Sequence, residues 1–90
     1  MSIAEDIVAQ AEQCMVNLGE VLYQTGCQWQ DVVRARYLLT CREDFPACWP
    51  VLKKYLGEAA PAATMMLVGL YDSAMKIEIE VTARLPSKSA

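Results

Sequence analysis

Residues 61–84, with the sequence PAATMMLVGLYDSAMKIEIEVTAR, contain the pattern that decides the fold. In the second half of this stretch apolar and polar residues alternate strictly, the apolar set being Met75, Ile77, Ile79, Val81 and Ala83. A period of two residues is typical of a β-strand that buries one face. An apolar run at residues 61–70 precedes this strand and is separated from it by a four-residue break. We interpret the two segments as a strand hairpin.

The preceding residues add a further strand and two helices. Residues 31–40, DVVRARYLLT, are rich in β-branched and aromatic residues, and Ala35, Tyr37 and Leu39 alternate with Arg34, Arg36 and Leu38. Apolar residues at steps of three and four predict one helix from Ile7 down to Gly26, where a left-handed glycine would end it. They predict a second helix from Phe45 to Leu56, with Gly57 just past its end and a kink or a late start expected at Pro50. The order helix, strand, helix, strand, strand predicts a two-layer α/β sandwich. We expect one domain over residues 1–90, with a disordered tail at residues 86–90.

Composition excludes several classes of function. The chain has eight basic and eleven acidic residues and a net charge of −3, so a nucleic-acid partner is not expected. It contains no histidine, which excludes Ser-His-Asp and Cys-His nucleophile pairs and HExxH zinc sites. The cysteines at positions 14, 27, 41 and 48 lack CxxC spacing, so neither a metal nor another cofactor is expected.

Features of the sequence also predict where the protein is found. Acidic Glu5 and Asp6 stand where a signal peptide would carry basic residues, so reduced cysteines in the cytoplasm are expected. No uncharged run is long enough to span a membrane, because the longest candidate, residues 59–71, is short and contains Pro61. We therefore expect no contact with a membrane.

Several pieces of the chain resemble the YjgF/RidA family, also called the Rid superfamily. They are AEQCMVNL at residues 11–18, Gly26 followed by WQDVV at 29–33, Asp44-Phe45, PAATM at 61–65 and IEIE at 77–80. The resemblance covers roughly residues 8–85. It implies a chorismate-mutase-like fold and a homotrimer that binds small molecules in clefts between subunits. It also implies hydrolysis of reactive enamine and imine intermediates to keto acids, with release of ammonia.

The resemblance also implies roles for particular residues. Glu78 matches the glutamate that positions the attacking water, and the backbone around Thr64 and Met65 would contact the substrate. Active family members follow the Pro-Ala pair with an arginine that holds the substrate carboxylate, but this chain has Ala63 there. An asparagine often found in the second helix is also replaced, near Trp49. We expect a divergent member with weak or lost deaminase activity, or alternatively a non-catalytic ligand-binding or scaffolding homotrimer.

Four side chains have more than one interpretation. Glu78 could be a solvated carboxylate paired across the sheet with Lys76 or Arg84. Arg34 and Arg36 could replace the missing guanidinium, although ion pairing with Glu78 or Glu80 is the favoured interpretation. Cys41, which is next to Arg42, is the best candidate for a reactive thiol, although ordinary thiols are expected.

The start of the chain is a second departure from the family. Family members begin with two or three strands before the first helix, whereas this chain begins almost at that helix. Two explanations remain open: the sequence is a truncated piece, or its three strands form a reduced sheet. An uncovered strand edge presents unpaired backbone groups, which favours pairing with another chain.

Overall fold

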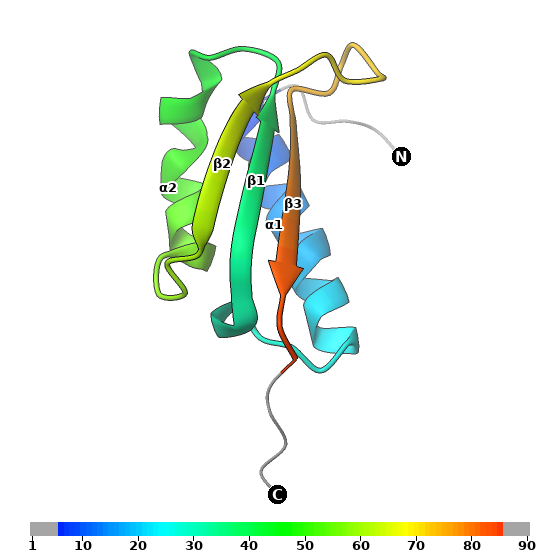
Figure 1. Ribbon diagram of the computed structural model, residues 1–90. Coiled ribbons are helices and arrows are strands. Elements are labelled where there is room, and N and C mark those ends of the chain that lie inside the picture. The colour runs from blue at the N-terminus through cyan, green and yellow to red at the C-terminus, as the bar shows by residue number, and fades with distance from the viewer. Residues whose placement is uncertain (1–5, 86–90) are drawn as a thin grey trace, which may run out of the picture.

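The computed structural model describes residues 6–85, and these residues form two helices packed on one face of a three-stranded sheet (Figure 1). The predicted α/β sandwich and its element order are confirmed. The elements are helix α1 (Ile7–Gln24), a 3₁₀ turn η1 (Trp29–Asp31), strand β1 (Val32–Leu39), helix α2 (Asp44–Leu56), strand β2 (Ala62–Leu67) and strand β3 (Ile77–Ala83). The predicted tail at residues 86–90 lies outside the described residues.

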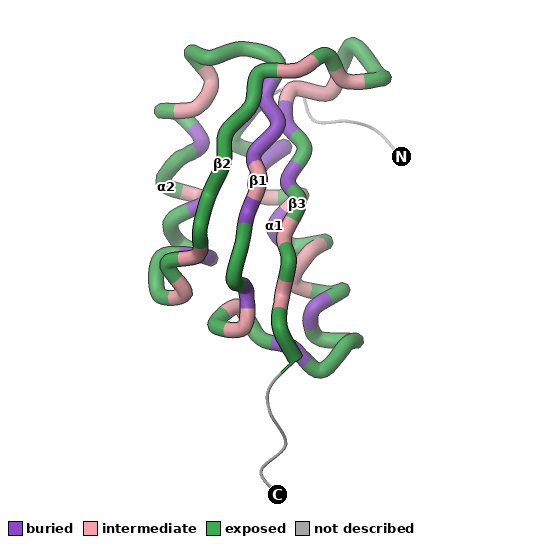
Figure 2. Tube along the Cα trace, in the orientation of Figure 1, coloured by how far each residue is buried: buried purple, intermediate pink, exposed green. Residues whose placement is uncertain are grey.

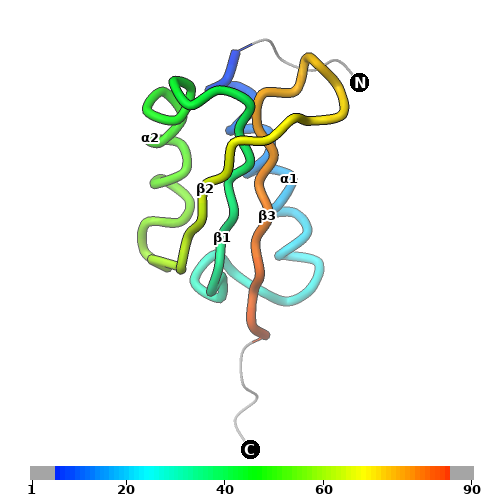
Figure 3. The backbone as a smooth tube through the Cα atoms, turned by 45° about the horizontal axis from the view of Figure 1, so that its top comes forward, coloured from blue at the N-terminus to red at the C-terminus, as the bar shows by residue number. Residues whose placement is uncertain are grey.

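The sheet has the order β2-β1-β3, so the predicted hairpin is wrong. β2 is parallel to β1, with Tyr37 opposite Met65, and β3 is antiparallel to β1, with Tyr37 opposite Ile79. The connection between β2 and β3 crosses the end of β1 (Figure 3). Two backbone bonds hold it there, from Val68 N to Leu39 O at 2.9 Å and from Thr40 N to Lys76 O at 3.2 Å. Both edges of β1 are thereby paired, an arrangement that a hairpin of β2 with β3 would not provide.

The core lies between the helices and the sheet (Figure 2). β1 contributes Ala35, Tyr37 and Leu39, which are all buried as the alternation predicts. Their neighbours include Met15 and Ala11 from α1, Leu52 and Leu56 from α2, and Ile77 and Ile79 from β3. Burial of one such aliphatic side chain stabilises a fold by about 1.5–3 kcal/mol, so the register of β1 and β3 is set by which face is apolar.

Local signals account for the ends of the first helix. The Asp6 carboxylate accepts a hydrogen bond from Val8 N at 2.8 Å and caps the start of α1. Gly26 has φ of 83°, which confirms the predicted left-handed glycine after the helix. A β-carbon at Gly19 would lie 3.3 Å from the Trp29 ring, so this glycine makes room for the indole.

The second helix runs without interruption from Asp44 to Leu56, with Pro50 inside it. Among residues 6–85, no helix is long and apolar enough to cross a lipid bilayer.

The other face of the sheet carries no helix. On β1 this open face consists of Arg34, Arg36 and Leu38, the residues that alternate with the core positions. Their partners across the sheet on β2 are Ala62, Thr64 and Met66, and those on β3 are Thr82, Glu80 and Glu78. Every residue of β2 is exposed, and within the described residues no strand pairs with its outer edge (Figure 2).

Candidate functional site

The four residues expected at the site lie on two different faces of the sheet. Glu78 and Thr64 are on the open face, because they are in register with Leu38 and Arg36 of β1. Ala63 and Met65 are on the helix face, because they are in register with the buried residues Ala35 and Tyr37. Within one chain the structure therefore brings Ala63 close to α2 and leaves Glu78 on the opposite side of the sheet.

A cavity of about 260 Å³ lies between α2 and β2 and has Ala63 in its wall. Most of its lining is apolar and comes from the helix, with Trp49, Leu52 and Leu56 among the contributors. From the resemblance, Ala63 and a position near Trp49 are expected to differ from the residues of active members. Ala63 and Trp49 lie in the wall of the same cavity.

The lining of this cavity also includes a tyrosine and a lysine. Tyr37 reaches it from β1, and burial raises the pKa of its phenol, with a smaller contribution from Cys48. Lys53 reaches it from the last turn of α2. The sequence pattern does not show that Lys53 lies near Ala63, because this depends on how α2 crosses the sheet.

Glu78 is exposed on β3, and its carboxylate forms no hydrogen bond or ion pair within residues 6–85. The interpretation that pairs it with Lys76 or Arg84 is therefore not supported. Its charge reaches Cys14 on α1, where burial first and the Glu78 carboxylate second raise the pKa of the thiol. A carboxylate without a partner is available to hold a water.

Arg36 does not supply the missing guanidinium to the cavity. It forms an ion pair with Glu80 across the open face, at 3.7 Å between Nη1 and Oε2. Arg34 shares that face with Arg36, and both are therefore on the side of the sheet away from Ala63. The predicted pairing of these arginines with the glutamates of β3 is confirmed for Arg36.

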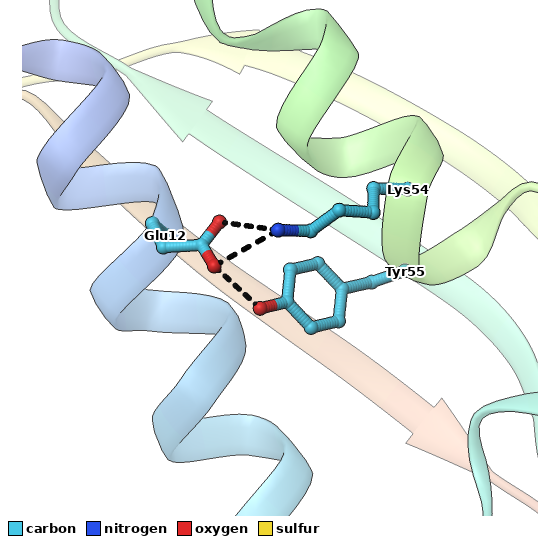
Figure 4. Close-up of polar contacts among 3 residues, drawn as sticks. All are labelled: Glu12, Lys54 and Tyr55. Carbon is cyan, nitrogen blue, oxygen red and sulfur yellow. Dashed lines mark hydrogen bonds and ion pairs between the residues drawn. The ribbon is translucent and has the colours of Figure 1, made fainter.

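A second, more open cavity of about 550 Å³ lies at the C-terminal end of α2, with Trp29, Tyr55 and both lysines in its lining. Next to it, Glu12 on α1 accepts a hydrogen bond from the Tyr55 hydroxyl at 2.6 Å and from Lys54 Nζ at 3.1 Å (Figure 4). The bond from Tyr55, followed by that from Lys54, lowers the pKa of the Glu12 carboxyl. This cluster joins the two helices, and its ion pair holds the Lys54 ammonium beside Glu12.

The environment of Cys41 is the opposite of what a reactive thiol needs. Its thiol donates a hydrogen bond to Glu43 Oε2 at 2.9 Å, and this bond is the main reason that the pKa of Cys41 is raised. All four cysteines are free, and Cys27 and Cys48 are buried. In the described part of the chain, no three Cys, Asp or Glu side chains lie close enough together to hold a metal ion.

Comparison with known proteins relates this chain to one family. The sequence model of the family described as Endoribonuclease L-PSP matches residues 1–85. A RutC family protein from Synechocystis is 35% identical over 83 residues, which are 91% of this chain and 64% of that protein. The goat 2-iminobutanoate/2-iminopropanoate deaminase is 35% identical over 77 residues, 86% of this chain and 56% of the enzyme. The chain thus spans less than two thirds of the length of these relatives.

Solved structures agree with the sequence comparison. The crystal structure of a YjgF/YER057c/UK114 family member from Mycobacterium tuberculosis matches with a TM-score of 0.87 and 28% identity. The match covers 91% of this chain and 70% of that one. A putative endoribonuclease from Thermotoga maritima matches with a TM-score of 0.89 and 25% identity, over 97% of this chain and 68% of the other. The chain therefore belongs to the Endoribonuclease L-PSP family, which is the YjgF/Rid family of its relatives.

Proposed function

We propose that the chain is a divergent imine or enamine hydrolase of the Rid type, with weak deaminase activity because Ala63 replaces an anchoring arginine. Two observations support this proposal. The goat and human relatives named 2-iminobutanoate/2-iminopropanoate deaminase are 35% and 30% identical to it. The cavity wall contains Ala63, and the chain keeps an unpaired carboxylate at Glu78.

In the proposed reaction, Glu78 orients a water and takes its proton as the water adds to the imine carbon. Glu78 then returns this proton to the nitrogen, which gives a carbinolamine. The remaining hydroxyl proton passes to the nitrogen as the carbon–nitrogen bond breaks and the carbonyl double bond forms, so that a keto acid and ammonia leave. The backbone of Thr64 and Met65 contacts the substrate. No metal or other cofactor enters the reaction.

The proposed site requires more than one copy of the chain. Ala63 and Glu78 are on opposite faces of the sheet, so the cavity of one protomer and the Glu78 of a neighbour together make one site in a homotrimer. β2 supports this arrangement, because Met65, Met66 and Leu67 are 40%, 40% and 51% exposed on an apolar edge strand. Such an edge is a surface for another chain to cover.

The expected weakness of the activity follows from the chemistry of alanine. A methyl group donates no hydrogen bond, whereas a guanidinium binds a carboxylate through two. Loss of a charge-assisted contact of this kind costs about 2–5 kcal/mol of binding free energy. The substrate is therefore held loosely, and turnover is slow.

The test is to generate a short-chain imino acid in situ and to follow its hydrolysis. We expect a slow rate above buffer that Glu78→Gln abolishes and Ala63→Arg increases. Glu80→Gln is the matched control, because Glu80 is on the same strand and face but is paired with Arg36. A wild-type rate equal to that of buffer, with no gain in Ala63→Arg, would show that the chain is not a hydrolase of this type.

The second candidate is a non-catalytic ligand-binding or scaffolding homotrimer, and it is favoured by the lack of a donor at Ala63. It predicts saturable ligand binding that Glu78→Gln leaves unchanged. Cleavage of RNA, which the family description suggests, is disfavoured by the net charge of −3 and the lack of histidine. A cytoplasmic location stays a prediction that agrees with four free thiols.

A further inference from the structure

We propose that Lys53 is the cation that binds a carboxylate in the Ala63 cavity, and that this cavity selects small carboxylic acids with an apolar body. This inference rests on the proposed function, because it names the substrate class of the same site. It assigns to α2 a role that an arginine on β2 performs in active Rid members.

The proposal depends first on the different positions of Lys53 and Lys54. Lys53 lines the same cavity as Ala63 and also the neighbouring open cavity, so its side chain is at the boundary between them. Within residues 6–85 the Lys53 ammonium forms no ion pair or hydrogen bond, whereas the Lys54 ammonium is 3.1 Å from the Glu12 carboxylate. Of this pair of lysines, Lys53 is the one whose ammonium is free to meet an anion.

The proposal depends next on the residues that line the Ala63 cavity. Trp49, Leu52, Leu56 and Pro61 surround the space next to Lys53. Among the described residues that line this cavity, Tyr37 is the one that carries a hydroxyl group, and a phenol can donate a hydrogen bond. One cation, one phenol and largely apolar walls fit a monocarboxylate with an apolar or aromatic body. They do not fit a highly hydrated anion such as phosphate, because most of the wall offers it no donor.

The chemistry of lysine agrees with weak activity. An ammonium binds a carboxylate as a point charge and lacks the two-pronged geometry of a guanidinium. It therefore supplies part of the attraction that the missing arginine would give. A purely structural role is the simpler interpretation, since a lysine in the last turn of a helix interacts favourably with the helix dipole. That role alters stability and leaves ligand affinity unchanged.

The experiment measures binding without turnover, by titrating the protein with phenylacetate and following Trp fluorescence and NMR chemical shifts. Phenylacetamide serves as the neutral probe of the same shape, and inorganic phosphate as the anion without an apolar body. We expect saturable binding of phenylacetate, and affinity about tenfold lower for the amide and for Lys53→Gln. Lys53→Arg should retain binding, and Ala63→Arg should restore it in the Lys53→Gln background.

Lys54→Gln is the matched control, because it removes the adjacent charge and leaves the cavity intact. Equal affinity of wild type and Lys53→Gln for phenylacetate would overturn the proposal. So would equal affinity for acid and amide, or phosphate binding as tight as that of phenylacetate. An equal loss of phenylacetate affinity in Lys54→Gln would show that binding responds only to the net charge of the protein, and this result would also overturn the proposal.

The two proposals fail in different ways. If phenylacetate binding depends on Lys53 but no imine is hydrolysed, the binding site stands and the hydrolase function fails. If imine hydrolysis is measurable and Lys53→Gln leaves its KM unchanged, the hydrolase function stands and the role of Lys53 fails.

Discussion

Ala63 and Glu78 lie on opposite faces of one sheet, on the two strands that flank β1. Two strand spacings separate β2 from β3, a distance of about 10 Å across the sheet. A substrate in the cavity next to Ala63 is therefore shielded from the Glu78 of its own chain. This relationship makes assembly a requirement for the proposed chemistry.

Complementation between chains tests that requirement. Wild-type protein lacks an arginine at position 63, and the double variant Ala63→Arg/Glu78→Gln lacks the carboxylate. Co-expressed, the two chains should form mixed trimers in which the introduced guanidinium of one chain faces the Glu78 carboxylate of another. We expect imine hydrolysis above that of either protein alone. A rate equal to the average of the separate proteins would place the site within one chain.

The exposed β2 strand should be the surface on which assembly depends. A lysine in place of Leu67 puts a charge on the apolar edge strand, and we expect Leu67→Lys to be monomeric in native mass spectrometry while wild type is trimeric. Val21→Lys is the control, because Val21 is 57% exposed on α1, away from the sheet edge. If both variants keep the wild-type mass, assembly does not use β2.

The contact of Glu12 with Tyr55 should make stability depend on pH. Because its folded pKa is lowered, Glu12 contributes stability above the ordinary pKa of a carboxyl group and loses it as pH falls through the lower, folded value. We expect the melting temperature of wild type to fall more steeply than that of Glu12→Gln between about pH 5 and pH 3. If the melting temperatures of the two proteins fall equally with pH across this range, the contact is not maintained in solution.

The bond from Cys41 to Glu43 should slow the reaction of this exposed thiol. A raised pKa reduces the thiolate fraction at neutral pH, and the thiolate is the nucleophile. We expect Glu43→Gln to increase the rate of alkylation of Cys41 by iodoacetamide several-fold at neutral pH, measured by peptide mass spectrometry. Cys41→Ser identifies the modified site, and an unchanged rate in Glu43→Gln would contradict the assignment.

Much of the fold could be predicted because it depends on local geometry. Side chains alternate along a strand whatever it pairs with, so the burial of Ile77 and Ile79 and the exposure of Glu78 and Glu80 follow from the sequence. The position of the left-handed glycine at residue 26 follows in the same way, because that conformation favours a residue without a β-carbon.

The strand order and the composition of the cavity are decided only by the tertiary structure. Residues 61–84 look like a hairpin, but α2 carries the chain back so that β2 lies parallel to β1 on the side away from β3. Which strand edges pair depends on backbone hydrogen bonds between residues far apart in sequence. The alternation of apolar and polar residues along one strand does not indicate its partner. For the same reason, only the packing of α2 over the sheet shows that Lys53, Trp49 and Ala63 line one cavity.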